Sequence, residues 1–115
     1  MSNPPSGTVT FLFTDIEGST RLAREHPDTW ETLRSRHHQI LPESIVSNNG
    51  FVFQIIGDAF CAAFHKAADA LRAALEAQQR LQSEVWGECV IRVRMGIHTG
   101  EAELHENEYQ GYLTL

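Results

Sequence analysis

Two aspartates stand at positions where their carboxylates could carry out chemistry. Asp15 follows residues 8–14, a β-branched and aromatic segment that is typical of a buried strand. Asp58 follows a glycine between two short apolar segments, 51–56 and 59–64, a pattern typical of a β-hairpin tip. Carboxylate oxygens are the ligands that Mg²⁺ and Mn²⁺ prefer, usually completed by water and substrate phosphates. If the two carboxylates converge, they could hold a pair of such cations for an in-line displacement at phosphorus.

The segment that follows Asp15 is suited to binding phosphate. Gly18 permits a tight turn, and Ser19 or Thr20 can cap a short helix that we expect to end near Glu25. The free N–H groups and the dipole at the start of a helix attract anions. Each feature is weak by itself, because strand-end aspartates and Gly-Asp turns are most often structural. The combination is what favours a phosphate site.

The other elements complete an α+β order. We expect a helix from about 27 to about 48, in which Pro42 produces a kink or starts the last segment. We also expect a helix at 67–85, a strand at 89–97 and, after a turn at 98–100, a short segment at 101–105. This order, βααββαβ, favours a ferredoxin-like split βαβ sheet with helices packed on one face. In such a sheet the first strand lies centrally beside the hairpin. We therefore expect the side chains of Asp15 and Asp58 to converge.

The composition is that of an ordinary globular domain and limits the partners. The 115 residues are 42% apolar and 21% charged, which fits one domain. A net charge of −6 with scattered basic residues argues against nucleic acid as a partner. No segment has the apolar length of a membrane span, and residues 1–7 read as a flexible lead without secretory features. We expect a cytoplasmic protein whose two cysteines, Cys61 and Cys89, are buried.

Three blocks of the sequence resemble a known family. TFLFTDIEGSTRL at 10–22 is similar to the opening signature of bacterial class III adenylate/guanylate cyclases. FVFQIIGDAFCAAF at 51–64 looks like the metal-binding hairpin of that family, and RMGIHTGEAE at 94–103 looks like the strand that follows it. The blocks occur in the family's order and span nearly the whole chain, so residues 8–115 are interpreted as a class III nucleotidyl cyclase domain.

This resemblance implies an activity and a site. The family converts ATP or GTP to a 3′,5′-cyclic nucleotide and pyrophosphate, with two Mg²⁺ or Mn²⁺ ions per site at the interface of a head-to-tail homodimer. By motif match, Asp15 and Asp58 would be the catalytic residues that ligate both metals, and the Ile16 carbonyl would add a ligand. The residues that would face the triphosphate are Glu17, Gly18, Ser19 and Thr20.

The sequence departs from the family pattern at several positions. Gln54 stands where the family usually carries a purine-reading lysine, and Glu108 matches the second purine-reading position. Leu115 stands where active members carry a ribose-orienting asparagine, and the transition-state arginine would follow it. We therefore expect a domain that is incomplete at its C-terminus and, as a fragment, inactive or nearly so.

Two readings from different functional classes remain open. The pair Asp15 and Asp58 favours an enzyme, whereas Gln54 and Leu115 favour a degenerate cyclase-homology domain that dimerises or senses nucleotide. A diguanylate cyclase is disfavoured because its Gly-Gly-Asp/Glu-Glu-Phe hairpin is absent from the sequence. The arginines at 92 and 94 are expected on the wet face of a strand or at an interface rather than as a phosphate clamp.

Overall fold

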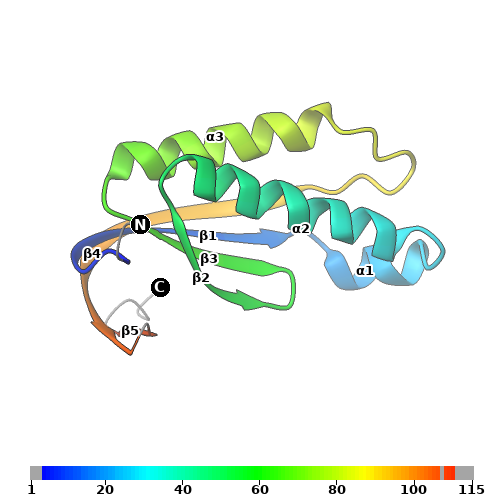
Figure 1. Cartoon of the computed structure of the whole chain (residues 1–115). Helices are drawn as coiled ribbons and strands as arrows, with labels where there is room; N and C mark the ends of the chain where they lie inside the picture. Colours follow the sequence, from blue (N-terminus) through cyan, green and yellow to red (C-terminus); the bar gives the residue numbers. More distant parts are fainter. Residues whose placement is uncertain (1–3, 107, 111–115) are drawn as a thin grey trace.

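The strands of the molecule pair in the order β2-β3-β1-β4-β5, and every pairing is antiparallel. This computed structural model describes residues 4–106 and 108–110 (Figure 1). The elements along the chain are β1 (Gly7–Ile16), α1 (Ser19–Glu25), α2 (Trp30–Ser47), β2 (Phe51–Ile56), β3 (Ala59–Phe64), α3 (Ala67–Ser83), β4 (Val93–His105) and β5 (Glu108–Gln110). Helices α2 and α3 cover one face of the sheet (Figure 1). The expected α+β split βαβ arrangement is confirmed.

Strand β1 is the centre of the sheet and is buried on both faces. It pairs with β4 over all ten of its residues, from Gly7 opposite Ala102 to Ile16 opposite Val93. Its other edge pairs with β3. Because side chains alternate along a strand, the apolar run of β1 supplies two cores at once. Leu12 belongs to the core beneath the helices, and Phe11 belongs to the core on the opposite face.

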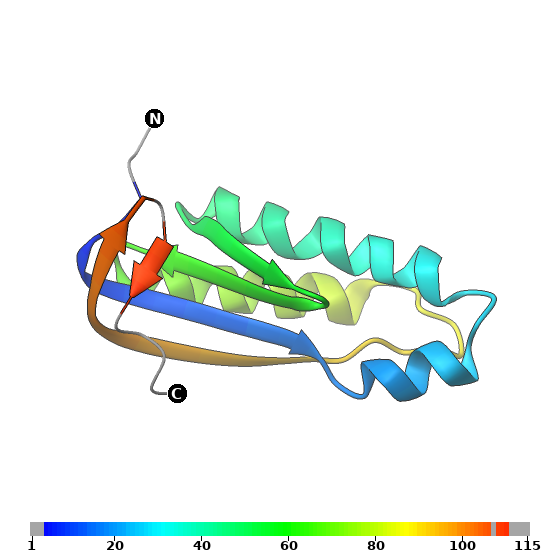
Figure 2. The ribbon, with the colours of Figure 1, turned by 90° about the horizontal axis from the view of Figure 1, so that it is seen from below.

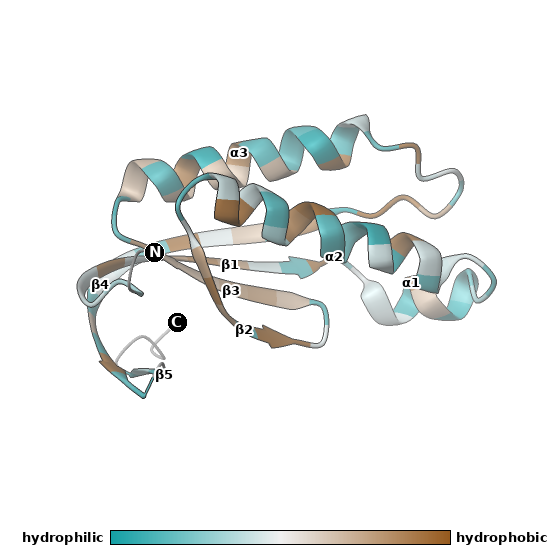
Figure 3. Cartoon of the chain, viewed as in Figure 1, coloured by the Kyte–Doolittle hydropathy of each residue, from teal (hydrophilic) through white to brown (hydrophobic). Residues whose placement is uncertain are grey.

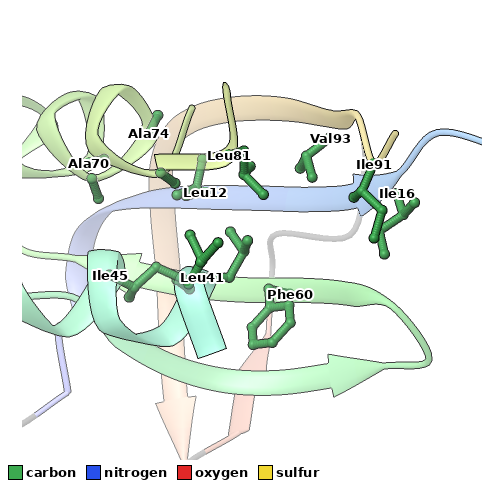
Figure 4. Close-up of a cluster of buried hydrophobic side chains, with 14 of the residues drawn as sticks. Leu12, Ile16, Leu41, Ile45, Phe60, Ala70, Ala74, Leu81, Ile91 and Val93 are labelled. Carbon is green, nitrogen blue, oxygen red and sulfur yellow. The ribbon is translucent and has the colours of Figure 1, made fainter. Parts of the chain in front are cut away.

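The core beneath the helices is built from large side chains of α2 and small ones of α3. Leu41 and Ile45 of α2 belong to the same cluster of buried side chains as Phe60 of β3, as Figure 4 shows. Helix α3 contributes mainly alanines, including the buried Ala70 and Ala77, so its backbone can lie close to the sheet. Polar residues gather on the outer sides of both helices and in the connecting loops (Figure 3).

The second core is aromatic and is covered by the far end of the chain. Strand β4 bends so that β5 lies below the face of the sheet opposite the helices (Figures 1 and 2). Tyr109 of β5 packs edge-on against Phe11 and Phe53, with ring centroids 5.3 and 4.7 Å apart. Its hydroxyl donates a hydrogen bond of 2.7 Å to the Pro5 carbonyl. This contact shields from water a face that β1 would otherwise leave apolar and exposed.

Several details differ from the sequence expectations. The turn expected at 98–100 is wrong, because that segment continues β4 and pairs with β1 through Gly100 opposite Val9. The segment 84–92 is a loop, so the strand expected to begin at 89 begins at Val93. Helix α2 continues through Pro42. Pro5 is buried, so ordered structure starts within the segment assigned as a flexible lead.

Two expectations about the described residues agree with the structure. Cys61 and Cys89 are both buried and free. None of the helices among residues 4–106 and 108–110 has the length and apolar character needed to cross a membrane.

A histidine lies fully buried between α2 and the sheet. His37 is 0% exposed, and its ring packs edge-on against Phe60. Its Nδ1 lies 2.9 Å from Nδ1 of His38, and its Nε2 has no hydrogen-bond partner. Burial, with a smaller contribution from the charge of His38, lowers the pKa of His37 from 6.5 to about 4. The imidazole is therefore neutral in the folded chain at neutral pH.

This buried histidine predicts a specific loss of stability in acid. Well above pH 6.5 His37 is neutral in both states and adds no pH dependence. Between pH 6.5 and about 4, His37 is protonated in the unfolded chain but stays neutral in the folded chain, so the free energy of unfolding falls. Of this fall, about 2 kcal/mol should occur between pH 6.5 and pH 5. Urea unfolding at several pH values should show the fall in the wild type and its absence in His37→Leu. The matched control, His105→Gln at an exposed site, should keep it.

Gly18 has a backbone conformation that only glycine adopts without strain. It is the residue before α1, with φ of +65°, and its carbonyl accepts the first helical hydrogen bond from Leu22 N–H at 3.0 Å. No side chain caps α1, so the expected capping by Ser19 or Thr20 is wrong and the left-handed glycine turns the chain instead.

We expect Gly18→Ala to lower the free energy of unfolding by about 1 kcal/mol, because an L-residue is strained at this φ. Gly96→Ala is the matched control, since a Cβ there meets no atom within 4 Å and its φ is not positive. Chemical denaturation measures both. Equal stability of the two variants would contradict the strain argument.

Candidate active site

The two aspartates and the start of α1 lie at the same end of the sheet. Strand β1 ends there, α1 begins just beyond it, and the turn between β2 and β3 lies beside them (Figures 1 and 2). The register explains this placement. Thr14 pairs with Phe60, so continuing the same register sets Ile16 opposite the position of Asp58. The fold therefore brings together three segments that are separate in the sequence.

Asp15 lies on the sheet face away from the helices and is paired with an arginine. Arg94 stands directly opposite it on β4 and donates two hydrogen bonds of 2.9 Å, one to each carboxylate oxygen. These bonds raise the pKa of the Arg94 guanidinium, which stays charged. The sequence analysis placed Arg94 on a wet strand face, which is correct, but it did not find the partner. Only the pairing of β1 with β4 reveals it.

A pocket of about 280 Å³ adjoins this pair. Asp15, Arg94, Phe13 and Cys61 contribute to its lining, together with Gly96. Burial raises the pKa of the Cys61 thiol, so this side chain is a small neutral group in the pocket wall. The pocket lining thus combines apolar side chains with one carboxylate and one guanidinium.

Asp58 is paired with side chains from α2. Its carboxylate accepts a hydrogen bond from Nε of Arg34, and Nε2 of His38 lies 3.9 Å from the same oxygen, Oδ1. Arg34 and His38 are four residues apart, one turn of helix, so they share a face of α2. Sequence reasoning did not assign Arg34 to the site. The four-residue spacing was visible in the sequence, but only the fold shows that this helix face meets the hairpin tip.

The backbones of Asp15 and Asp58 lie at the same end of the sheet, as expected, but their side chains do not converge. The carboxylate of Asp15 lines a pocket on the face away from the helices, whereas the carboxylate of Asp58 turns toward α2. The physical reason is charge pairing: each carboxylate is held by the nearest arginine, and the two arginines come from opposite sides of the sheet. Asp58 sits in a turn, so rotation of its side chain does not require a strand to move.

The Ile16 carbonyl faces the hairpin. Glu17 N–H donates to the Arg92 carbonyl on the β4 side at 2.8 Å. In an antiparallel strand, neighbouring residues direct their backbone groups to opposite sides, so the carbonyl of Ile16 is directed toward β3. The ladder between β1 and β3 ends at Thr14, so this carbonyl lies beyond the last pair.

The donor set at this end of the sheet fits a hard divalent cation. Two carboxylates and one backbone carbonyl are oxygen ligands of the kind that Mg²⁺ and Mn²⁺ take, with water and phosphate completing the shell. Both carboxylates already attract a cationic group in the form of a guanidinium. Among the described residues, no group of three or more His, Cys, Asp or Glu side chains could hold a metal by itself. A metal here would depend on the two aspartates, the carbonyl and its substrate.

The four residues assigned to the triphosphate surround the start of α1. Glu17, Gly18 and Thr20 are exposed and Ser19 is partly exposed. The N–H groups in the first turn of a helix have no partners within the helix, so they remain available to an anion. The N–H of Glu17 is the exception, because it is used in the bond to Arg92.

Of the two candidate purine-reading residues, Gln54 lies on the face of the sheet away from the helices, and Glu108 belongs to β5, which lies below that face (Figure 1). Gln54 is opposite Cys61 in the β2–β3 ladder, just after an irregularity between Val52 and Gln54. Cross-strand partners share a face, so Gln54 lies on the side of the Asp15 pocket. Glu108 is exposed at the start of β5, next to Tyr109, whose ring meets that of Phe53. Leu115 lies outside the described residues.

Known proteins resemble this chain in sequence. A sequence profile described as the adenylate and guanylate cyclase catalytic domain matches residues 1–105. An uncharacterized protein of Mycobacterium tuberculosis is 37% identical over 110 residues, a match that covers 94% of this chain and 36% of that protein. A receptor-type adenylate cyclase of Trypanosoma brucei brucei is 29% identical, over 94% of this chain and 12% of that protein. The chain thus spans about a third or less of the length of these relatives.

Solved structures resemble it in fold. An adenylate cyclase of Trypanosoma brucei, analysed in its monomeric state, superposes with a TM-score of 0.84 at 27% identity, covering 96% of this chain and 66% of that one. An adenylate/guanylate cyclase/hydrolase from Silicibacter pomeroyi gives a TM-score of 0.77 at 27% identity, covering 95% and 66%. Since the family profile extends over nearly the whole sequence and the fold agrees, this chain belongs to the family of adenylate and guanylate cyclase catalytic domains.

Proposed function

We propose that the cyclase domain of which this chain forms part binds ATP or GTP with two Mg²⁺ or Mn²⁺ ions and forms a 3′,5′-cyclic nucleotide and pyrophosphate, and that the 115 residues alone are inactive or nearly so. The proposal is supported by membership of the cyclase family and by one observation of the structure. The register of β1 against β3 sets Ile16 opposite the position of Asp58, beside Asp15 and the start of α1. Metal ligands and phosphate-binding amides therefore meet at one end of the sheet.

The residues at this end of the sheet would have separate roles in binding the metals and the nucleotide. Asp15, Asp58 and the carbonyl of Ile16 would hold the cations. When bound there, Mg²⁺ or Mn²⁺ would lower the pKa of the ribose 3′-hydroxyl and neutralise charge on the phosphates. The backbone at Glu17 to Thr20 would orient the triphosphate through the first turn of α1, which fixes the α-phosphorus in line with the attacking hydroxyl. No covalent enzyme intermediate is required.

The proposal includes a head-to-tail homodimer. Within the described residues, one chain supplies both carboxylates, but the site remains open to solvent: the side chain of Arg94 at the edge of the Asp15 pocket is 65% exposed. Catalysis by electrostatic stabilisation is strongest where water is excluded. A second copy laid against the sheet face that carries Asp15 and Gln54 would close the site.

The metal assignment predicts the behaviour of an Asp58→Ala variant. A full-length cyclase domain that contains this chain should be incubated, as wild type and as variant, with Mn²⁺ and either ATP or GTP, and cyclic product should be measured by chromatography. We expect product in the wild type to fall at least a hundredfold in Asp58→Ala, because loss of a metal ligand removes transition-state stabilisation. Glu84→Ala, which removes a carboxylate that is paired with Arg36 and not assigned to the site, is the control. Product that persists in Asp58→Ala would refute the metal role.

Gln54 favours a second candidate function, a nucleotide-sensing or dimerising domain without turnover. A glutamine has both a donor and an acceptor, so it can contact a purine edge without selecting one base. The same experiment separates the two functions. Saturable, Mn²⁺-dependent nucleotide binding without product would establish the sensing role. Absence of both product and binding would argue for dimerisation alone.

Substitutions of Gln54 should change base preference in opposite directions. A lysine is only a donor and suits the acceptor N1 of adenine, whereas a glutamate is only an acceptor and suits the N–H groups of guanine. We expect Gln54→Lys to raise the ratio of ATP to GTP affinity by about tenfold and Gln54→Glu to lower it similarly, since each hydrogen bond to a charged group contributes about 1.5 kcal/mol or more. Competition binding with both nucleotides measures the ratio. If the ratio of ATP to GTP affinity shifted equally and in the same direction in both variants, Gln54 would not be a purine-reading residue.

A further inference from the structure

The tip of the β2–β3 hairpin is fastened to α2 by two side chains. Arg34 donates from Nε to the Asp58 carboxylate and from Nη2 to the Gly57 carbonyl, the latter at 3.4 Å. His38, one helical turn later, brings Nε2 to 3.4 Å from the same carbonyl. Both the carboxylate and the backbone of the turn are therefore held by α2.

The ion pair between Arg34 and Asp58 is partly shielded from water. The side chain of Asp58 is 18% exposed and that of Arg34 is 32% exposed, in contrast to the Asp15–Arg94 pair at 45% and 65%. Screening by water weakens exposed ion pairs most, so the Arg34 pair is the less screened of the two. A carboxylate held in this way does not face the pocket of Asp15.

A guanidinium and a divalent cation compete for the same oxygen. While Asp58 is bound to Arg34 it cannot complete a ligand set with Asp15, because the Asp15 carboxylate lines a pocket on the sheet face away from α2. The apparent affinity of a site is reduced in proportion to the fraction of molecules in the competent state. An ion pair populated in most molecules thus weakens metal binding without any contact to the metal.

We propose that Arg34 is a positioning residue that keeps Asp58 on the α2 side in the metal-free chain and thereby sets the metal affinity of the site. Metal binding exchanges the guanidinium for the cation, and the hairpin carboxylate turns toward Asp15. This inference rests on the proposed function, since it takes Asp58 as a metal ligand. It adds a residue outside the cyclase sequence blocks, on helix α2.

Mn²⁺ binding to the whole chain tests the proposal without requiring turnover. Free Mn²⁺ is followed by electron paramagnetic resonance during titration of the wild type, Arg34→Lys and Arg34→Gln. We expect the dissociation constant to fall about three- to tenfold in Arg34→Gln, as the competing partner is removed. Arg34→Lys should be intermediate, because an ammonium keeps the charge but loses the fork that joins the carboxylate to the Gly57 carbonyl.

A matched control lies on the same helix. Arg36 is 36% exposed, is paired with Glu84 at 2.9 Å, and its replacement by glutamine removes the same charge. Arg36→Gln should leave Mn²⁺ affinity within about twofold of the wild type, since a general charge effect falls off with distance and salt. An equal gain in Mn²⁺ affinity in Arg34→Gln and Arg36→Gln would overturn the proposal, because it would show a nonspecific electrostatic effect of removing one positive charge.

A metal-free measurement tests the ion pair separately. In EDTA, urea unfolding of the wild type, Arg34→Gln, Asp58→Asn and the double variant should show coupling. The unfolding equilibrium constant of the double variant should differ about three- to tenfold from the value expected for independent effects. Additive effects would overturn the proposal. If Arg34→Gln unfolds, Arg34→Lys takes its place in both experiments.

The outcomes separate the two hypotheses. If Asp58→Ala retains Mn²⁺ binding, the proposed metal site fails whatever the coupling in EDTA. If Asp58→Ala loses binding while Arg34→Gln binds Mn²⁺ with unchanged or weaker affinity, the metal site stands and the role of Arg34 is overturned. If the wild type does not bind Mn²⁺, a gain of binding in Arg34→Gln supports the proposal and no gain overturns it.

Discussion

The structure depends on the pairing of β1 with its two neighbours. Ten consecutive residues of β1 pair with β4, and the other edge pairs with β3, so the strand is buried on both faces and at both edges. Its alternating apolar side chains then serve two cores. A one-residue slip would move Phe11 under the helices and Leu12 to the aromatic face. The same register sets Asp15 opposite Arg94 and sets Ile16 opposite the hairpin tip, so packing and site geometry are fixed by one constraint.

Charge compensation dominates the arrangement of side chains at the site. Each candidate metal carboxylate binds an arginine from a different element, Arg94 of β4 for Asp15 and Arg34 of α2 for Asp58. Two aspartates at one end of a sheet repel each other when neither is neutralised, and a guanidinium is the best partner that the chain can offer. In this structure the two arginines hold the carboxylates of Asp15 and Asp58 apart. A divalent cation that bound both carboxylates would bring them together.

The aromatic core explains how a sheet with helices on one face is stable in water. Phe11 and Phe53 would be exposed on that face if the chain ended with a straight β4. The bend of β4 brings Tyr109 over them, and its hydroxyl reaches back to the carbonyl of Pro5. The beginning and the far end of the described chain therefore meet on the face that carries Gln54 and Glu108. Closure of this core and placement of the candidate purine-reading residues have the same cause.

The sequence by itself determined the elements and the residue types of the site. Local patterns were enough to place the hairpin tip at Asp58, to end β1 near Asp15 and to identify the helices, because apolar periodicity and turn glycines act over a few residues. They did not show that 98–100 continues β4, since a glycine-containing segment becomes a strand only when a long partner such as β1 is beside it. Nor did they pair Arg34 with Asp58 or Arg94 with Asp15. Ion pairs between distant segments form only after the backbone is folded, when the nearest opposite charge is chosen by tertiary distance rather than by sequence.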